Sequence, residues 1–230
     1  GDLTTCFGWQ DNDNLKETLA SQMAKMIREE PVDKKEEILK HEEGIDLIPA
    51  NLELSGLEMM LVNTMSRETD LKEYLKDIKC SYDYVLIDCM PSLGMITINA
   101  LSAADSVLIP VQAQYLPAKG MTQLVQTINR VKKINPNLKI DGIVMTLVDG
   151  RTNLAKTVSE TLKRNYGKVI KIYDAKIPTA VKAAEMATRG VSIYSYDKNS
   201  PVAKAYQELT KEVIKDGEKR RDKSKSSLCR

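Results

Sequence analysis

The fold is decided by the stretch Tyr82-Asp83-Tyr84-Val85-Leu86-Ile87-Asp88-Cys89-Met90-Pro91-Ser92-Leu93-Gly94. Its short apolar run, residues 85–87, ends in a carboxylate, and a turn and a helical pattern follow at once. A run of this length between turn residues predicts a strand buried on both faces of a sheet. Ligands of open α/β sheets lie beyond the carboxyl ends of the strands, where Asp88 stands. Asp88 therefore either holds a magnesium ion beside a nucleotide or only caps the next helix.

Strand and helix patterns alternate on both sides of this stretch. Before it, helices are expected over 15–30, 33–40 and 69–78, with a strand over 44–49 and a helix after Asn51. After it, strands are expected over 106–110, 140–147 and 168–173, and helices over 93–103, 121–131, 152–166, 179–188 and from Ser200-Pro201 onward. Such alternation predicts an α/β fold with a mostly parallel sheet and helices on both faces.

The composition is that of an ordinary globular protein, with 42% hydrophobic and 29% charged residues among 230. No apolar run is long enough to span a membrane, and no export signal opens the chain. The four cysteines show no metal-ligand spacing, so we expect reduced thiols in a cytoplasmic protein. The single histidine, His41, stands among charges and is expected at a solvated surface, which disfavours histidine-based catalysis.

The apolar pattern stops at about Asp216. Residues 211–230 hold eight Lys/Arg against four Asp/Glu. The sequence therefore predicts one domain over residues 1–215 and a basic, frayed tail over residues 216–230.

Five blocks in order, spread over most of the chain, carry a family resemblance. They are Tyr82–Gly94, Ala100–Gly120, Thr146–Leu154, Ile177–Glu185 and Tyr196–Tyr206. Together they resemble the ParA/Soj-type partition ATPases, of the ParA/MinD group of deviant P-loop ATPases. The resemblance implies a three-layer P-loop NTPase-like sheet, ATP and Mg²⁺ as cofactors, and an ATP-dependent homodimer. It also implies sequence-independent DNA binding on the nucleoid, a ParB-like partner protein, and no membrane.

The start of the chain resembles a point well inside such a protein. Gly1-Asp2-Leu3-Thr4-Thr5 is similar to the end of the segment that follows the second strand of the family. No GxxxxGK[ST] loop occurs in the sequence, and that loop's backbone N–H groups and lysines cradle phosphate. We therefore expect a family member that lacks its first βαβ unit, and we predict that this chain alone does not hydrolyse ATP.

The resemblance gives roles to residues at the predicted strand ends. Asp88 is the Walker B acid, which orders Mg²⁺ through water. Pro178 lies against the adenine, or is an ordinary turn proline. Thr146 lines the base pocket, or is a buried strand threonine. Gln112 acts as a second switch near the phosphates, or is a polar loop residue.

The loop that begins at Asp149 has two interpretations. With Arg151 and Asn153, it resembles a loop that meets the nucleotide or the partner subunit. Helix capping by Thr152 or Asn153 explains part of the same pattern without any function.

Basic residues in the last third of the chain are candidates for DNA contacts, since non-specific binding needs only cations that displace counterions from phosphates. A solvated surface of mixed charge is the alternative for each of Lys182, Arg189, Lys198 and Lys204. Two other functions stay open. A MinD-like positioning ATPase usually ends in an amphipathic membrane helix, and the tail here lacks an apolar face. A non-catalytic DNA-binding or regulatory relic agrees with the missing phosphate loop.

Overall fold

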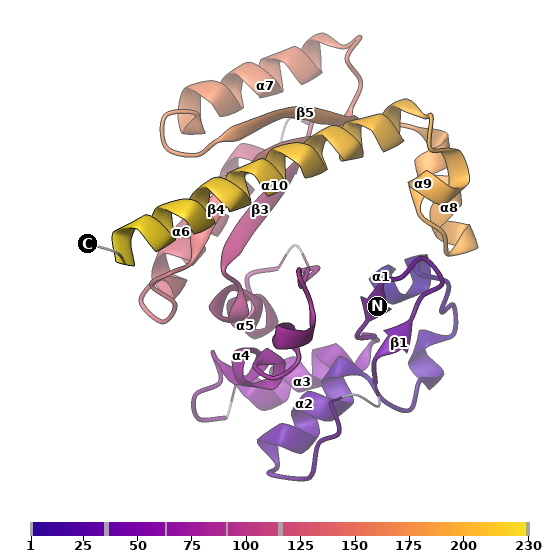
Figure 1. Ribbon diagram of the computed structural model, residues 1–230, viewed down its shortest axis with the longest axis vertical. Helices are drawn as coiled ribbons and strands as arrows, with labels where there is room; N and C mark the ends of the chain where they lie inside the picture. The colour runs from indigo at the N-terminus through magenta and orange to yellow at the C-terminus, as the bar shows by residue number, and fades with distance from the viewer. Residues whose placement is uncertain (1, 35–36, 63, 91, 115–116, 229–230) are drawn as a thin grey trace. The chain divides into compact units, whose positions relative to one another are not determined.

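The computed structural model describes residues 2–34, 37–62, 64–90, 92–114 and 117–228, with the backbone alone for 117–119 and 219–228. The chain divides into two units (Figure 1), and each is described by itself. The first unit comprises residues 1–105, 124–138 and 185–192, and the second comprises residues 106–123, 139–184 and 193–230. Gly1 and Pro91, which belong to the sequence motifs above, lie outside the described residues.

The first unit is mainly helical. Thr18 begins α2 with a capping box, because its side chain accepts from the Ser21 N–H while the Ser21 side chain accepts from the Thr18 N–H. The core buries Met23, Leu61 and Tyr74 almost completely. The elements are α1 (Asp2–Cys6), η1 (Asn12–Asn14), α2 (Leu19–Ile27), β1 (Leu39–Lys40), β2 (Asp46–Leu47), α3 (Glu53–Leu61), α4 (Asp70–Leu75), η2 (Lys79–Ser81) and α5 (Met95–Ala103).

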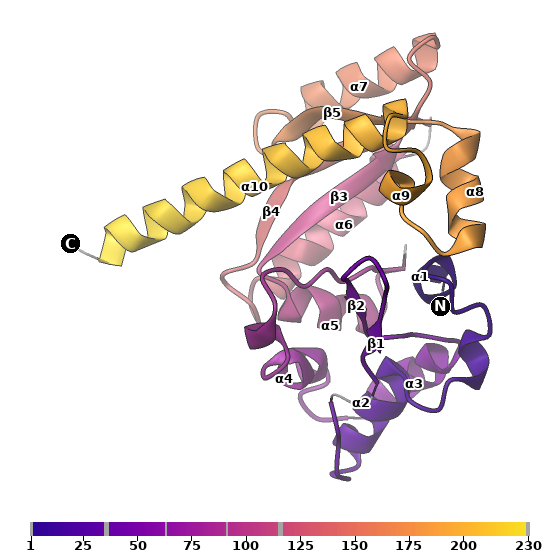
Figure 2. The ribbon, with the colours of Figure 1, turned by 45° about the vertical axis from the view of Figure 1, so that its right-hand side comes forward.

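The second unit is built on a parallel sheet of order β3-β4-β5. Its strands are β3 (Ser106–Gln112), β4 (Lys139–Val148) and β5 (Ile172–Pro178). Figure 2 shows α10 (Pro201–Leu228) crossing in front of the strands and α7 (Asn153–Tyr166) beside β5 at the top of the view. The remaining helices are α9 (Ile193–Asp197), and α6 (Pro117–Val131) and α8 (Val181–Arg189), which have residues in both units. The predicted α/β class, with a parallel sheet and helices on both faces, is confirmed.

The segment Tyr84–Met90 differs from the buried strand that its sequence predicts. It has no regular secondary structure and no ladder partner among the described residues, and the Leu86 side chain is 91% exposed. The expectation of a strand buried on both faces is therefore wrong for this segment. An apolar sequence is buried in a sheet only where strands pair on either side of it, and no described strand does so here.

Helix α10 continues through Leu228, into the segment where the charge pattern predicts a frayed tail. Lys, Arg and Glu are good helix formers, so helical propensity persists where the apolar pattern ends. The division of the chain at residue 216 stays a prediction. Within the part of the chain that the structure describes, no helix is both long and apolar enough to cross a membrane.

Candidate functional site

The carboxyl edge of the sheet in the second unit gathers three of the predicted site residues. Because all strands run the same way, β3, β4 and β5 end at one edge. Gln112 pairs with Thr146, and the next pair along the same edge is Val148 with Pro178. Gln112, Thr146 and Pro178 therefore lie at the position where open α/β sheets hold ligands.

Backbone hydrogen bonds extend the ladders past the last strand residues. The Ala113 N–H donates to the Thr146 carbonyl at 3.1 Å, and the Thr179 N–H donates to the Val148 carbonyl at 3.3 Å. The first residue of the loop after β3 and the first residue after β5 are thus hydrogen-bonded to β4. These bonds fix the point at which each loop leaves the sheet edge.

Leu147 is a residue of this edge that the sequence did not indicate. Its φ is 51° and its side chain is half exposed. A left-handed conformation is costly for a branched residue, by roughly 1–3 kcal/mol, and such outliers gather at functional sites. No sequence signal predicts it, because leucine ordinarily avoids this conformation.

The Asp149 carboxylate is hydrogen-bonded within its own loop, to Arg151. It accepts from the Arg151 backbone N–H at 3.1 Å and from the guanidinium Nε and Nη2 at 3.0 and 3.1 Å. These side-chain hydrogen bonds hold the pKa of Asp149 below its ordinary value. Thr152 then caps α7, accepting from the Ala155 N–H at 3.3 Å. The capping interpretation is therefore confirmed for Thr152, and Asp149 forms a charged turn before the helix.

Asp88 lies in the first unit, in the irregular segment before α5, and its side chain is exposed. Helix α5 begins after Gly94 without a side-chain cap, so the interpretation of Asp88 as the cap of that helix is wrong. Ser92 orders the turn instead, since its carbonyl accepts from the Thr97 hydroxyl at 2.6 Å and its hydroxyl accepts from the Gly94 N–H at 3.2 Å. Among the residues that the structure describes, none donates a hydrogen bond to the Asp88 carboxylate in this turn, and Asp88 does not cap α5.

The candidate DNA-binding residues belong to both units. Lys182 lies in the second unit and pairs with Asp197 at 2.7 Å, so part of its charge is neutralised locally. Lys204 is exposed on α10, in the second unit, and Arg189 is exposed at the end of α8, in the first. Among the described residues no cluster of three or more His, Cys, Asp or Glu side chains could hold a metal ion.

The fold and this edge define an α/β protein with a parallel sheet, a class in which ligands sit beyond the strand ends. Residues 1–140 match the family model described as "AAA domain". The chain is 45% identical over 176 residues to the sporulation initiation inhibitor protein Soj of Bacillus subtilis, covering 76% of this chain and 69% of that protein. It is 41% identical over 174 residues to the chromosome partitioning protein ParA of Caulobacter vibrioides, covering 74% and 64%. The chain belongs to the ParA/Soj family of partitioning ATPases.

Solved structures share the fold of this chain. Cobyrinic acid a,c-diamide synthase from Mycobacterium smegmatis, solved with an ATP analogue and magnesium, superimposes with a TM-score of 0.71 at 34% identity, over 81% of this chain and 74% of that one. A putative plasmid partition protein from Borrelia burgdorferi has the same fold, with a TM-score of 0.71 at 23% identity over 93% and 82%. The chain thus spans roughly two thirds to four fifths of each of these four relatives.

Proposed function

We propose that this chain is the larger part of an ATPase that partitions DNA. ATP and Mg²⁺ close a homodimer, the dimer binds DNA without sequence preference on the nucleoid, and a ParB-like protein triggers release. Family membership supports the proposal, and the observation that carries it is the common edge formed by Gln112, Thr146 and Pro178. There the polar and proline groups suit the base and phosphate ends of a nucleotide.

The residues present fit only part of an ATP–Mg²⁺ site. Asp88, in the first unit, is an exposed carboxylate of the kind that binds Mg²⁺ directly or through water. The 230 residues contain no loop that cradles phosphate. We therefore derive no hydrolytic step from these residues alone.

The unpaired segment Tyr84–Ile87 indicates where a strand that carries the phosphate loop could pair. Its backbone has no ladder partner among the described residues, and Tyr84 and Leu86 are exposed. A strand paired with this segment would cover both, and the loop after that strand would end beside Asp88, since parallel strands end at one edge. We propose that such a strand and phosphate loop complete the site.

Phosphate release is the direct test. The purified 230-residue chain, incubated with ATP and Mg²⁺, is expected to show no turnover above buffer. A form that also carries a GxxxxGK[ST] loop ahead of residue 1 is expected to turn over ATP. In that form Asp88→Asn should lower the rate at least about tenfold, while Asp83→Asn should not. Robust magnesium-dependent turnover by the 230-residue chain would show that this division of the site is wrong.

DNA binding is tested separately, with the same longer form and random-sequence duplexes. Affinity is expected to need ATP and to fall steeply between low and physiological salt, because counterion release drives it. Replacing Lys182, Arg189 and Lys204 together by Glu should weaken binding to all sequences equally. Unchanged affinity in the triple variant would remove these three residues from the DNA interface.

A further inference from the structure

Leu147 is the one residue with a left-handed backbone inside a strand, among the residues that the structure describes. Its φ is 51°, and it stands one residue before the end of β4. The other two non-glycine residues with positive φ, Glu29 and Ser66, lie outside helices and strands. Glu29 closes α2, where its N–H donates to the Met26 carbonyl at 3.1 Å and a left-handed residue is ordinary. No helix end explains the conformation of Leu147.

The left-handed residue belongs to a bulge at the carboxyl edge of the sheet. Met145 pairs with Lys176 and Val148 pairs with Pro178, so β4 takes three steps where β5 takes two. The residues on either side of Leu147 are held to the adjacent chain segments by the carbonyl hydrogen bonds described above. Bulges redirect a side chain next to functional sites, and a left-handed residue in a bulge is usually glycine.

The leucine side chain contributes little to the fold at this position. It is 49% exposed, so only half of it packs against the rest of the protein. Glycine reaches a φ of 51° without the steric cost that a Cβ and a branched side chain add. The path of the backbone therefore does not require leucine. A half-exposed apolar side chain on a strained backbone is instead typical of a residue that contacts another molecule.

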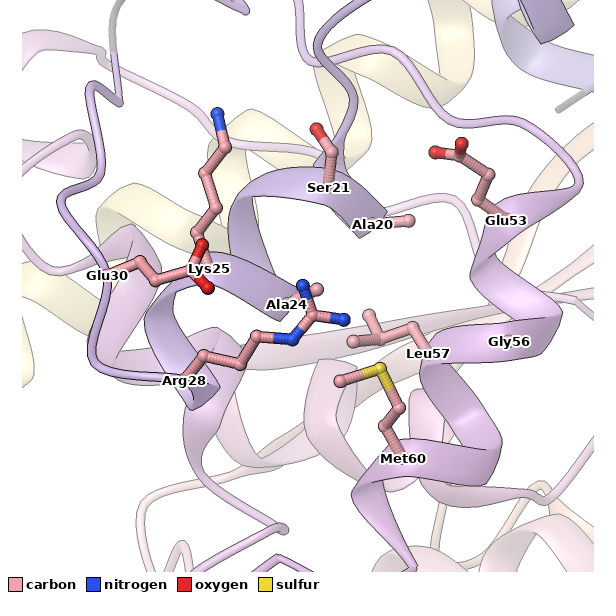
Figure 3. A pocket seen from close by; sticks show the side chains of 10 residues that line it. All are labelled: Ala20, Ser21, Ala24, Lys25, Arg28, Glu30, Glu53, Gly56, Leu57 and Met60. Carbon is pink, nitrogen blue, oxygen red and sulfur yellow. The ribbon is translucent and has the colours of Figure 1, made fainter.

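The hollow between α2 and α3 in the first unit differs from this edge. It measures about 460 Å³, and Figure 3 shows side chains of both helices around it. Ala20 and Leu57 on its walls are 3% and 2% exposed and belong to the core. Those walls are already packed within the protein, whereas Leu147 keeps half of its side chain exposed.

We infer that Leu147 is a specificity-determining contact for the base of the nucleotide, an inference that rests on the proposed function. Leu147 lies between Thr146 and the pair that Val148 forms with Pro178, at the edge proposed for the nucleotide. An apolar side chain has no donor or charge to offer a phosphate, but it covers the flat face of an adenine ring. The bulge fixes the backbone beforehand, so binding the base has only the side chain to order.

Adenosine, which carries the base but no phosphate, tests the inference on the 230-residue chain. Methyl and amide NMR spectra are recorded during the titration, and ribose is the control probe because it lacks the base. Adenosine is expected to shift the Leu147 methyl resonances through the ring current of its purine. Ribose is expected to leave these resonances unchanged.

Variants at the same position separate the side chain from the backbone. Leu147→Gly removes the side chain, Leu147→Asn makes it polar, and both residue types tolerate a positive φ, so the unfolding transition should be retained. Both should bind adenosine at least roughly fivefold more weakly, because the exposed half of a leucine is no longer covered. Leu147→Met should retain binding. The amides of residues 146 and 148 report the affinity in every variant. Val169→Ala, an exposed apolar change in the turn before β5, should bind as the wild type does.

Three results would overturn the inference. The first is a Leu147 methyl resonance that adenosine does not shift, and the second is equal adenosine affinity in the wild type and Leu147→Gly. Both differ from a failure of the proposed function, which would appear as absent ATP turnover in the longer form. The third is a dimer of the wild type that Leu147→Gly dissociates while adenosine binding is unchanged, since the side chain would then belong to a protein contact.

Discussion

Glu37 is the most unusual titratable group of the first unit. Its side chain is almost completely buried, and neither carboxylate oxygen has a hydrogen-bond partner among the described residues. Burial is the main cause that raises the pKa of Glu37 from 4.5 to about 8; the charge of Glu17 acts in the same direction, and that of Lys25 opposes it. The group is therefore protonated in the folded protein at neutral pH.

This burial predicts a pH dependence of stability. The folded-state pKa lies above the unfolded value, so the contribution of Glu37 is fully present below pH 4.5 and is lost as pH rises to about 8. The free energy of unfolding should fall over this range by an amount on the order of a few kcal/mol. Glu37→Gln keeps the shape without the charge and should remove most of the fall. Urea melts from pH 5 to pH 9 measure it, with exposed Glu42→Gln as the control, and a fall retained in Glu37→Gln would contradict the prediction.

Gly190 is a position that only glycine fits. Its φ is +66°, and a Cβ there would lie 2.6 Å from the Cα of Gly8. Gly190→Ala should destabilise the first unit by roughly 1–3 kcal/mol, through backbone strain and a shift of the Gly8 loop. Gly217→Ala, in open space on α10, should be neutral or slightly stabilising. Equal denaturation midpoints for the two variants would show that the Gly8–Gly190 contact is unimportant.

The environment of the single histidine, His41, which contacts Gly190, differs from the predicted one. His41 was expected at a solvated surface, but its ring packs edge-on against Phe7 and Trp9 at 5.3 and 6.0 Å between centroids. Its Nε2 donates to the Gly190 carbonyl at 2.9 Å, while Nδ1 accepts from the Glu43 N–H at 3.2 Å. Neighbouring charges in a sequence do not show which side chain turns inward across a hairpin.

At the scale of elements, Asn99 joins α5 to the loop that begins α4. Its Oδ1 accepts from the Leu71 N–H at 3.1 Å, and its Nδ2 donates to the carbonyls of Arg67 at 2.6 Å and Met95 at 3.0 Å. Asn99→Ala would leave the buried Leu71 N–H and the part-buried Arg67 carbonyl without this partner, at a cost of about 1–3 kcal/mol in unfolding free energy. Thermal denaturation measures it, with exposed Asn137→Ala as the control. A loss no larger than that of the control would refute this role.

Element positions were predictable where periodicity was long. The strands at β3 and β4 and the helices at α5 and α7 lie within two residues of their predicted bounds. The strand expected over 168–173 was misplaced, because Val169 and Ile170 form a turn in which both N–H groups donate to the Tyr166 carbonyl. Strand β5 instead follows the alternation of buried Tyr173, Ala175 and Ile177.

The helix predicted over residues 33–40 is not formed at its C-terminal end, where the chain is a strand. Leu39 and Lys40 pair with Leu47 and Asp46 in the hairpin β1–β2, and residues 35–36 lie outside the described residues. Gly44, with φ +76°, allows the turn between the two strands. Pairing partners a few residues away override the weak helical preference of a short charged run.

The candidate site was predictable in the second unit and less so in the first. The family resemblance suggested Gln112, Thr146 and Pro178, and the parallel topology brings all three to one edge of the sheet. The left-handed backbone of Leu147 left no trace in the sequence. The burial of residues 85–87 depends on neighbouring strands, which local sequence cannot reveal.

At the scale of the whole molecule, the exposed segment Tyr84–Ile87 has a consequence in solution. An exposed apolar segment whose backbone has no ladder partner among the described residues can act as a template for pairing with another chain. The purified 230-residue chain should therefore self-associate with rising concentration, and the Leu86 side chain, 91% exposed, should contribute most.

Leu86→Lys should reduce this association, because a charge on an unpaired strand opposes pairing with a second chain. The free energy of unfolding should stay within about 0.5 kcal/mol of that of the wild type, since an exposed side chain makes few contacts. Sedimentation velocity over a concentration series measures the association. Val169→Lys is the matched control, because Val169 is 80% exposed but lies in a turn whose backbone N–H already donates to the Tyr166 carbonyl. If Val169→Lys dissolved the oligomer while Leu86→Lys left it intact, association would run through the second unit and the Tyr84–Ile87 segment would have no part in it.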